Sequence, residues 1–529
     1  MSVSAIIPAF DAADTVGATV CGAQSIPDVA QVIVVDDGSS DDTRNAAAVA
    51  GADEIVRLRT NRGKGGALAA GVEVAGYSRL LFLDADLGAS ASHASDLLKG
   101  APDFDQMSIA VFPSRAGGGG LGLAMGLARF TIRLLSGLQP AAPMSGQRAL
   151  SRELVKHVGL APRFGVEVAL TVEAALAGAT IQEIPLPLEH ARTGRSLTGF
   201  VHRGRQFLDI LRYLLLAGYG IGWPALSGRL TAARGLGALA ALVLIVTLAG
   251  RYAPAAGASA AAGAVMAVAL WLPCLWCTTV SLGLRRTNFL GRSIPSAAGA
   301  MFMLMAIPLL FYAPVDPARR TAAVIVLLSF ALLGLADDIF GGGPERGLRG
   351  HLRSLARRRI TTGSLKALGG LAAGLAAGYM VESGSPSLAV LDGLLIALTA
   401  NFVNLLDVRP GRALKGFFVV SLLVIFLAPE AISLLGPVLA AAVVCAPSDL
   451  SARTMLGDVG ANVLGGMAGL ALVLCLMPAD RLAAVLLLLA VHVLCERYSL
   501  TDIISRNRAL DWMDRLGTRH LGLLVRGKS

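Results

Sequence analysis

Apolar and polar positions divide this chain into two parts with different patterns. Up to about residue 205, short apolar runs alternate with polar turns, which is typical of a soluble α/β domain. From about Gly235 to Cys495 the apolar runs are longer, and only short polar loops separate them. We expect about ten transmembrane helices there, because such runs approach the hydrocarbon thickness of a bilayer. The shorter runs need tilt or shielding by neighbouring helices.

The expected helices alternate across the membrane in a way that the basic residues support. They cover residues 235–250, 262–283, 297–313, 321–336, 365–380, 388–406, 416–428, 431–446, 461–477 and 482–495. If the first crossing starts inside, most Arg and Lys fall in inside loops, as the positive-inside rule requires. No signal peptide is evident at the N-terminus. We therefore expect a multi-pass protein of the inner (cytoplasmic) membrane, with both termini and the first domain in the cytoplasm.

Three domains follow from this pattern. Residues 1–205 form the α/β domain, 206–233 a juxtamembrane segment, and 234–529 an all-α polytopic membrane domain. The middle segment mixes basic and apolar residues, which suits helices lying in the membrane interface. An ordinary linker helix is the alternative.

The overall composition agrees with a membrane protein. Mean hydropathy is +0.65 and only 16% of residues are charged, which excludes an ordinary soluble enzyme. The net charge of +10 suits anionic lipid headgroups, so we expect membrane lipids and no nucleic acid as partners. The pair Cys274 and Cys277 could indicate metal or redox chemistry. Buried thiols are the preferred interpretation, because no second pair or His cluster accompanies them.

Two acidic clusters follow apolar runs in the first domain. Asp36 and Asp37 end one run, and Asp84 and Asp86 follow another. Ligands of open α/β sheets bind beyond the carboxyl ends of the strands. Two carboxylates separated by one residue in an extended segment can also reach one hard cation. The pattern predicts a nucleotide diphosphate held through a divalent metal, with acidic strand-end turns as the alternative.

Residues 2–204 resemble the family 2 glycosyltransferases with the GT-A fold, most of all their polyprenyl-phosphate branch. The motifs that carry the resemblance are Ser4–Phe10 with Pro8, the pair Asp36-Asp37, Arg62–Gly66 with Lys64, the motif Asp84-Ala-Asp86, and Ser145–Ser151 with Arg148. The resemblance implies a UDP- or GDP-sugar donor bound by Pro8, Asp36, Asp37, Lys64 and Asp84. It implies Mg²⁺ or Mn²⁺ on Asp84 and Asp86, with Asp86 also catalytic. The segment Asp11–Asp14 replaces the usual Asn-Glu and leaves the choice of nucleotide open.

Further residues are expected near the acceptor. The resemblance places Arg148 on the acceptor side and makes Glu167 a catalytic candidate, with a solvent-facing helix carboxylate as its alternative. His190 could complete the metal shell or could be an ordinary loop histidine. Arg192 and Arg195 suit an acceptor phosphate, because guanidinium groups match phosphate oxygens. We find no dedicated general base, which favours an acceptor that is already an ionised phosphate.

The membrane domain holds a second group of polar residues in its expected inside loops. The group comprises Asp337, Asp338, Asn401, Asn404, Asp407 and Asp458. The two amides and Asp407 are three residues apart, so they follow roughly one helical face. Acidic residues at membrane depth are costly and are functional candidates. Helix caps are the alternative for each acid taken alone.

These residues resemble the motifs of polyprenyl-phosphate N-acetylhexosamine-1-phosphate transferases over about residues 287–507. The resemblance implies a Mg²⁺-assisted attack of a polyprenyl phosphate on a UDP-sugar, with Asp337, Asp338 and Asp458 catalytic and Asp337 and Asp458 on the metal. Asn401, Asn404 and Asp407 would hold the acceptor phosphate. Arg409, Arg412 and Lys415 stand where the family has another acid; they could hold a phosphate or simply satisfy the positive-inside rule. The family's His-rich loop is absent.

Taken together, the sequence predicts a membrane glycosyltransferase of cell-envelope glycan assembly. It would move a sugar from a nucleotide-sugar to an acceptor linked to undecaprenyl or decaprenyl phosphate, and the membrane domain could add a sugar-1-phosphate transferase activity. One rival makes the membrane domain an inactive lipid-holding platform. A second rival is a lipid-glycan transporter or flippase. The sugar, the stereochemical outcome and the formation of a homo-oligomer stay open.

Overall fold

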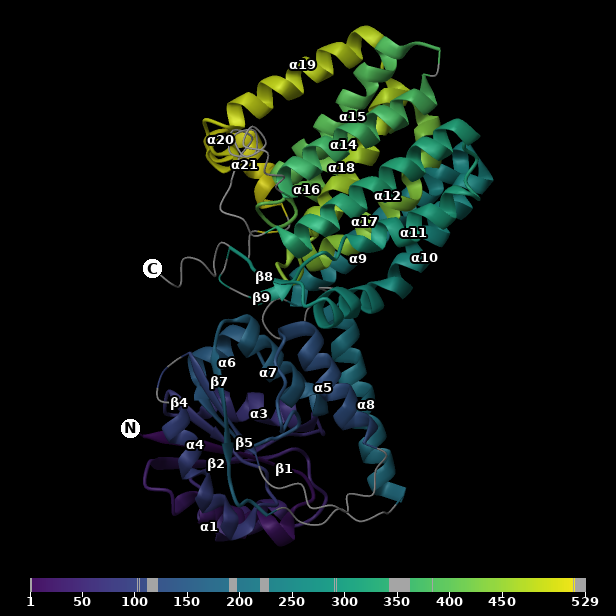
Figure 1. Ribbon diagram of the computed structural model, residues 1–529. Coiled ribbons are helices and arrows are strands. Elements are labelled where there is room, and N and C mark those ends of the chain that lie inside the picture. Colours follow the sequence, from purple (N-terminus) through teal and green to yellow (C-terminus); the bar gives the residue numbers. More distant parts are fainter. Residues whose placement is uncertain are drawn as a thin grey trace. The chain divides into compact units, whose positions relative to one another are not determined.

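The computed structural model divides into two compact units, each described by itself. The structure describes residues 2–101, 103, 105–111, 122–189, 197–218, 228–289, 291, 293–341, 362–382, 384–516 and 518. The first unit is mainly Met1–Gly218, and the second is mainly Ala232–Leu290 with Ile294–Ser529. Figure 1 shows the elements of both units by label.

A mixed seven-stranded sheet forms the centre of the first unit, in the order β3-β2-β1-β4-β6-β5-β7. The strands are β1 (Val3–Ala9), β2 (Val29–Asp36), β3 (Glu54–Arg57), β4 (Arg79–Phe82), β5 (Gln106–Val111), β6 (Arg148–Ser151) and β7 (Thr180–Pro185). Strands β3, β2, β1 and β4 are parallel, and β6 is antiparallel to both of its neighbours. The α/β fold predicted for the N-terminal part is confirmed.

Helices cover both faces of this sheet (Figure 1). They are α1 (Ala13–Gln24), α2 (Thr43–Val49), α3 (Gly63–Val74), η1 (Gly88–Ala94), α4 (Ser95–Gly100), α5 (Leu123–Ser136), α6 (Arg152–Val158), η2 (Arg163–Gly165), α7 (Val166–Leu176) and α8 (Leu197–Gly218). Adjacent residues of β1 point to opposite faces of the sheet and pack in different hydrophobic cores. Ile7 packs with residues of α1 and η1, and Ile6 packs with residues of α3 and α7. A strand buried on both faces needs a continuous apolar run, which explains Ala5-Ile-Ile7.

Helix α8 belongs to the first unit. The Tyr213 hydroxyl donates to Glu173 of α7 at 2.9 Å, and Asp209 accepts from the Phe164 amide at 3.3 Å. Ile210 and Leu214 are buried beside them. The predicted borders at residues 205 and 233, and the interfacial location of this segment, stay predictions.

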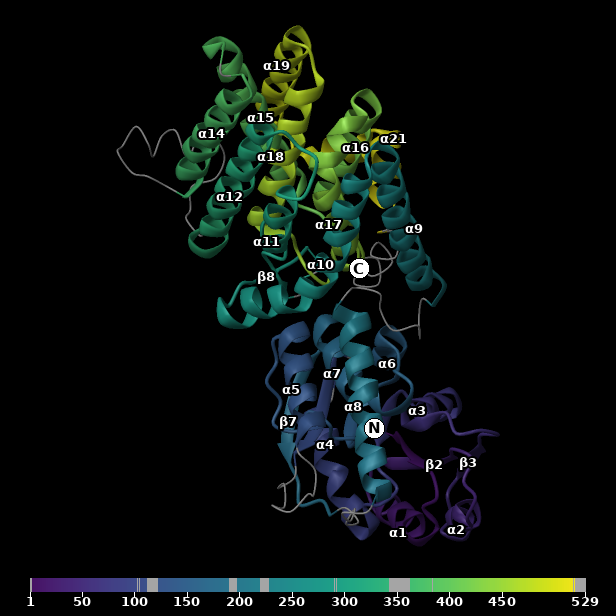
Figure 2. The same cartoon turned by 90° about the vertical axis from the view of Figure 1, so that its right-hand side faces the viewer.

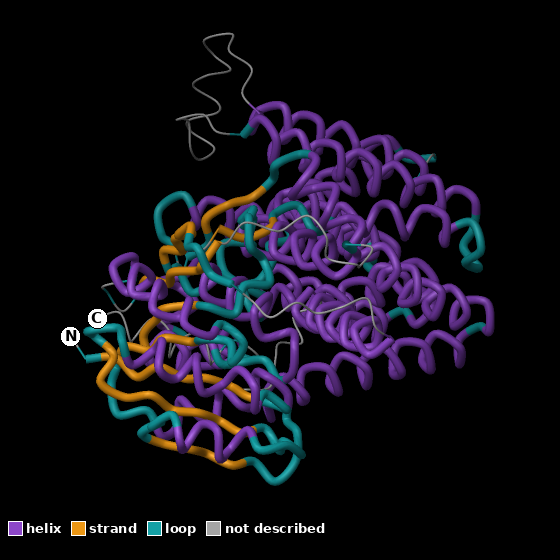
Figure 3. Tube along the Cα trace, turned by 90° about the horizontal axis from the view of Figure 1, so that it is seen from below, coloured by secondary structure: helices purple, strands orange, loops and turns teal. Residues whose placement is uncertain are grey.

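The second unit is helical, apart from the two short strands β8 (Arg285–Thr287) and β9 (Ser293–Pro295). Its helices are α9 (Gly228–Tyr252), α10 (Pro254–Trp276), η3 (Cys277–Ser281), α11 (Ala300–Leu310), α12 (Pro317–Phe340), α14 (Thr362–Val381), α15 (Pro386–Leu406), α16 (Arg412–Leu427), η4 (Pro429–Ala431), α17 (Ile432–Leu450), α18 (Gly457–Cys475), α19 (Pro478–Cys495), α20 (Leu500–Arg506) and α21 (Arg508–Arg515). Figures 2 and 3 show them as a bundle joined by loops.

Each of the ten expected membrane segments overlaps one of these helices. The predicted number of about ten membrane spans is not confirmed. Within the described residues, seven helical segments are long and apolar enough to cross a bilayer. They are Pro254–Ser281, Pro317–Phe340, Ser364–Val381, Pro386–Leu406, Pro429–Leu450, Gly457–Cys475 and Pro478–Cys495. The apolar stretches Ala238–Tyr252 and Ala300–Leu310 are shorter, and α16 has 16 residues. The seven candidates support a membrane protein.

Small residues allow the helices at the centre of this bundle to approach closely. A Cβ atom built on Gly299, just before α11, would lie 2.0 Å from the Cα of Gly460 in α18. One built on Gly334 of α12 would lie 2.5 Å from the Asp458 carbonyl oxygen. Such contacts between backbones are typical of membrane helices, whose association depends on close packing. They bring Asp458 next to the end of α12.

A buried ion pair joins α15 and α19 inside the second unit. Nη1 of Arg481 lies 3.0 Å from both carboxylate oxygens of Asp392, which is 0% exposed, and 3.2 Å from Glu382. We expect Arg481→Met to lower the free energy of unfolding by about 3–5 kcal/mol, because it leaves Asp392 buried without its cation. Thermal unfolding in detergent measures this loss. The Arg481→Met/Asp392→Leu double variant is expected to regain most of it; an equally unstable double variant would contradict the charge argument.

Candidate active site

The acidic strand ends predicted from the sequence meet at one edge of the sheet. In the parallel register Ala9 of β1 pairs with Asp36 of β2, and Ile6 pairs with Phe82 of β4. Asp84 follows β4 by two residues and therefore lies at the same edge. Asp36 is 2% exposed and accepts a hydrogen bond from the Ser39 amide at 2.8 Å.

Asp37 fixes the start of the loop before α3. Its Oδ1 accepts from the backbone amide of Arg62 at 2.7 Å, and its side chain is buried. Burial is the main reason why the pKa of Asp37 is raised, although the hydrogen bonds from Arg62 and Gly63 oppose the rise. One carboxylate thus ties the end of β2 to the segment that carries Lys64.

Lys64 lies at the centre of a charged cluster in the first unit. Its Nζ is 2.5 Å from Oδ1 of Asp84 and 2.8 Å from Oε1 of Glu167. The amide of Gln147 donates to Oδ2 of Asp84 at 2.7 Å. Burial alone would lower the pKa of Lys64, but the charges of Asp84 and Glu167 outweigh it and the pKa is raised. Lys64 is therefore a fixed cation at the sheet edge.

The cluster explains why residue 146 is a glycine. A Cβ atom built there would lie 2.2 Å from Nζ of Lys64 and 2.6 Å from Oδ1 of Asp84. Gly65 is equally restricted, since its Cβ would lie 1.7 Å from the Ala161 carbonyl oxygen. The sequence motifs around Lys64 and Gly146 thus reflect tight packing around one charged group.

We expect Gly146→Ala to separate Lys64 from Asp84 while the fold survives, because the lysine end is flexible and can move. The sugar-transfer activity predicted from the sequence, measured as nucleotide release, is expected to fall by about 10-fold or more, since a small displacement of groups that position a substrate commonly costs that much. Thermal unfolding should change little. Gly126→Ala is the matched control, because nothing lies within 4 Å of a Cβ built on Gly126. Equal activity of the two variants would contradict the role of the cluster.

Arg148 lies in the core of the first unit. It is 1% exposed, its Nε donates to the Ser145 carbonyl at 2.9 Å, and its Nη1 donates to the Thr171 hydroxyl at 3.0 Å. Burial lowers its pKa to about 10. The guanidinium therefore holds the loop of Ser145–Gln147 in place. A contact of Arg148 with an acceptor phosphate stays a prediction, and the sequence motif gave no indication that this side chain is buried.

Two of the three residues predicted to bind a metal ion in the first unit, Asp84 and Asp86, lie within the described residues. Asp84 and Asp86 supply carboxylate oxygens at the sheet edge, which fit a hard divalent cation. No group of three or more His, Cys, Asp or Glu side chains placed to hold a metal is found among the described residues. His190, the third predicted ligand, and Arg192 and Arg195 lie outside the described residues. Pro8 lies half-buried near the end of β1.

A second polar cluster lies in the helical unit, and its centre is Lys366 of α14. Its Nζ is 3.0 Å from Oδ2 of Asp458 and 3.6 Å from Oδ2 of Asp337. With its amide oriented to satisfy both neighbours, Asn404 donates to Oδ1 of Asp458 at 2.8 Å and accepts from Lys366 at 2.9 Å. Three of the predicted residues therefore meet around one lysine. Lys366 is not among the site residues predicted from the sequence, although a lysine opening an apolar helix was the available signal.

The other predicted residues of this unit take different positions. Asp338 is buried, accepts from the Val459 amide at 3.1 Å and lies 3.7 Å from Arg286. Asp407 is half-buried just after α15, whereas Asn401 is exposed. Asp338 thus joins α12 to the start of α18, and Asn401 does not join the cluster around Lys366.

The basic residues after Asp407 have partners from the chain itself. Arg412 and Lys415 bind Asp514 of α21, through its carboxylate and its carbonyl oxygen respectively. The guanidinium of Arg409 lies 5.2 Å from the centre of the Phe289 ring. In this structure Arg412 and Lys415 bind Asp514, and their contact with a lipid phosphate stays a prediction. Arg409 stays a candidate for binding the phosphate of the lipid acceptor.

Part of the first unit matches a known protein family. Residues 4–158 match the family described as Glycosyl transferase family 2. Glucosyl-3-phosphoglycerate synthase of Mycolicibacterium paratuberculosis is 32% identical over 197 residues, which are 32% of this chain and 59% of that protein. The chain thus spans less than two thirds of that relative. Undecaprenyl-phosphate mannosyltransferase of Micrococcus luteus is 26% identical over 249 residues, 44% of this chain and 99% of that protein.

A solved structure is also similar to part of the chain. The crystal structure of glucosyl-3-phosphoglycerate synthase from Mycobacterium tuberculosis with Mn²⁺, UDP-glucose and phosphoglyceric acid is 25% identical, with a TM-score of 0.34. The match covers 40% of this chain and 79% of that one. The prediction of a family 2 glycosyltransferase domain in the N-terminal region is confirmed. The resemblance of residues 287–507 to phosphotransferases stays a prediction.

Proposed function

We propose that this protein transfers a sugar from a UDP- or GDP-sugar to a polyprenyl phosphate at the cytoplasmic face of the inner membrane. The observation that carries the proposal is the meeting of Asp36, Asp84 and Lys64 at one sheet edge of a family 2 domain. Such an edge is where open α/β sheets bind ligands. The mannosyltransferase similarity supports a lipid phosphate as the acceptor, and the seven candidate spans support a location where that lipid is present.

The donor would lie across the ends of β1, β2 and β4. Asp36 and Asp37 would hold the nucleoside, and the ammonium group of Lys64 would donate to a phosphate oxygen. Asp84 and Asp86 fit Mg²⁺ or Mn²⁺, which supplies Lewis-acid stabilisation of charge on the leaving diphosphate. Glu167 holds Lys64 at 2.8 Å, so we propose that it positions this lysine.

The transfer needs little proton movement. An oxygen of the acceptor phosphate forms a bond to the anomeric carbon of the sugar, and the bond from that carbon to the β-phosphate oxygen breaks. The nucleoside diphosphate leaves with the electron pair. Because the acceptor phosphate is already ionised, no general base has to remove a proton. The sequence likewise offers no residue that is dedicated to this role.

A second activity, phosphoglycosyl transfer in the helical unit, is favoured by the cluster of Asp337, Asn404, Asp458 and Lys366. There a lipid phosphate oxygen would bond to the β-phosphorus of the donor, the bond to the α-phosphate would break, and a nucleoside monophosphate would leave. Asp337 and Asp458 could hold Mg²⁺ for this step, with Lys366 balancing their charge. If the helical unit does not catalyse this step, it would serve as a platform that holds the lipid acceptor.

The released nucleotide tests both proposals. Purified full-length protein is incubated with undecaprenyl phosphate, Mg²⁺ or Mn²⁺, and UDP- or GDP-sugars. Nucleoside diphosphate with lipid-linked sugar supports the first activity, and nucleoside monophosphate supports the second. A parallel reaction with 3-phosphoglycerate tests a water-soluble phosphate acceptor, as in the similar synthase. Transfer to that acceptor alone would overturn the lipid assignment.

A further inference from the structure

Helix α21 has its charged and apolar residues on separate faces. At helical spacing Asp511, Asp514, Arg515 and Arg508 follow one side, while Ala509, Trp512, Met513 and Leu516 follow the other. The side chain of Asn507 caps the helix, since its Oδ1 accepts from the amides of Ala509 at 3.0 Å and Leu510 at 3.2 Å. The helix is therefore a defined amphipathic element just after the last candidate span.

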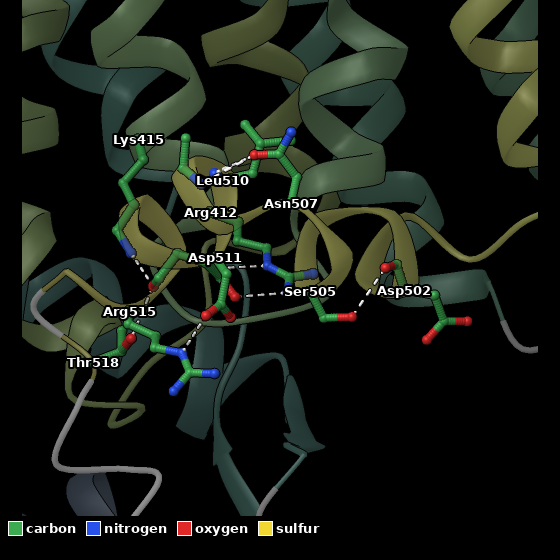
Figure 4. Close-up of polar contacts among 11 residues, drawn as sticks. Arg412, Lys415, Asp502, Ser505, Asn507, Leu510, Asp511, Arg515 and Thr518 are labelled. Atoms are coloured by element: carbon green, nitrogen blue, oxygen red, sulfur yellow. Dashed lines mark hydrogen bonds and ion pairs between the residues drawn. The ribbon is translucent and has the colours of Figure 1, made fainter.

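Helix α21 binds the rest of the helical unit through Asp514, whereas Arg508 and Arg515 of its charged face are exposed. Nε and Nη2 of Arg412 lie 2.7 and 2.8 Å from the two carboxylate oxygens of Asp514, and Nη1 donates to the Thr501 hydroxyl of α20 at 2.9 Å. Nζ of Lys415 donates to the Asp514 carbonyl oxygen at 2.6 Å. Figure 4 shows Arg412 and Lys415 extending from α16 towards α21. A two-point pair of this kind fixes orientation as well as position.

Electrostatics favour this docking at neutral pH. Burial alone would raise the pKa of Asp514, but the hydrogen bonds and charge of Arg412, with Lys415 and Arg409, outweigh it and the pKa is lowered. The pair therefore contributes stability above the ordinary pKa of an aspartate and loses it only as the pH falls through the lowered value. Arg412 is 5% exposed, so the contact is part of the folded unit.

The apolar face of α21 is left exposed. Among the described residues, Trp512 is 55% exposed and Leu516 is also exposed, whereas Met513 of the same face is half-buried. A water-surrounded helix normally turns its apolar face towards the protein. Here Asp514 points inward, and Trp512 and Leu516 lie on the opposite side of the helix and are exposed, which indicates an apolar environment outside. The candidate span α19 also exposes apolar side chains, and Tyr498 between α19 and α20 is exposed.

We propose that α21 is a membrane-interface helix whose apolar face lies in the bilayer at the boundary of headgroups and acyl chains. Exposed Trp and Tyr are enriched at that depth, and amphipathic helices bind there through their apolar face. The Arg412–Asp514 pair would hold the helix in this orientation. It would also fix the start of α16, where the Gly411 amide donates to Asp449 at 2.6 Å. This inference does not depend on the proposed transfer reactions.

Fluorescence of Trp512 tests the proposal. Full-length protein is reconstituted into vesicles of phosphatidylcholine and phosphatidylglycerol, with or without bromine on the acyl chains. Subtracting the emission of Trp512→Phe isolates Trp512 among the four tryptophans, and the conservative change keeps an aromatic ring at this exposed site. We expect bromine to remove most of this difference signal, while acrylamide in the water has little effect.

The other outcomes overturn the proposal. Strong quenching by acrylamide without quenching by bromine would place α21 in water. Protection from both quenchers would place the face against a second copy of the chain. Circular dichroism and thermal unfolding of Trp512→Phe verify that the variant is folded, so the difference signal reports the environment of this residue alone.

Discussion

Asp86→Asn is expected to lower nucleoside diphosphate release by about 100-fold or more, with the fold unchanged. A divalent cation contributes several kcal/mol to stabilising charge on a leaving diphosphate, and about 1.4 kcal/mol corresponds to a factor of 10 in rate. Asparagine keeps the shape of the side chain but removes the charge that the cation needs. Asp86 follows β4 at the sheet edge and is half-buried, so the change should not open a cavity.

The matched control for this variant is Asp96→Asn. Asp96 lies in α4 of the same unit and makes an exposed ion pair with Lys99. Its replacement by asparagine therefore removes one negative charge, as Asp86→Asn does, but at a position away from the proposed site. We expect the control to keep its activity, and a chelator to reduce wild-type release to the level of Asp86→Asn. Full activity of Asp86→Asn, or no effect of the chelator, would remove the metal from the account.

Asp458→Asn is expected to abolish nucleoside monophosphate release while nucleoside diphosphate release continues. Asp458 receives hydrogen bonds from both Lys366 and Asn404, so its charge organises the cluster of the helical unit. Removing that charge leaves Lys366 with only Asp337, at 3.6 Å, of the two acids described here. Since the first unit contains none of these residues, its reaction should persist.

The control for Asp458→Asn is Asp480→Asn, because Asp480 is an exposed acid in the first turn of α19. Both variants should unfold at similar temperatures in detergent. If Asp458→Asn still releases monophosphate, the cluster is not the phosphotransferase site. If the wild-type protein releases none, the helical unit is a platform, and the first activity stands by itself.

Local pattern predicted much of the fold. The apolar runs located the ends of β2 and β4, which carry Asp36 and precede Asp84, and parallel strands bring these ends to one edge of the sheet. Length and apolarity predicted helices α9 to α12 and α14 to α19 of the second unit, but not the short polar helices α20 and α21. Their borders shifted where alanine, glycine and proline decide them: α10 begins at Pro254, eight residues before the expected start, with proline in the first turn where it is tolerated.

The site was less predictable, because it depends on contacts between distant segments. Asp84 meets Gln147, 63 residues later, and Asp458 meets Lys366 across 92 residues. No local pattern distinguishes Arg148, which is buried in the core, from an arginine that binds a ligand. Likewise Arg412 looks like a basic loop residue in the sequence, yet it pairs with Asp514 from 102 residues away.

The most direct test of the central claim is mass spectrometry of the lipid product together with identification of the released nucleotide. Full-length protein is given undecaprenyl phosphate, a divalent metal and a UDP- or GDP-sugar. We predict undecaprenyl phosphate carrying one sugar, formed in equal amount with a nucleoside diphosphate and lost in Asp86→Asn. Release of a nucleoside monophosphate alone, or the absence of any lipid-linked sugar with every donor, would contradict the account.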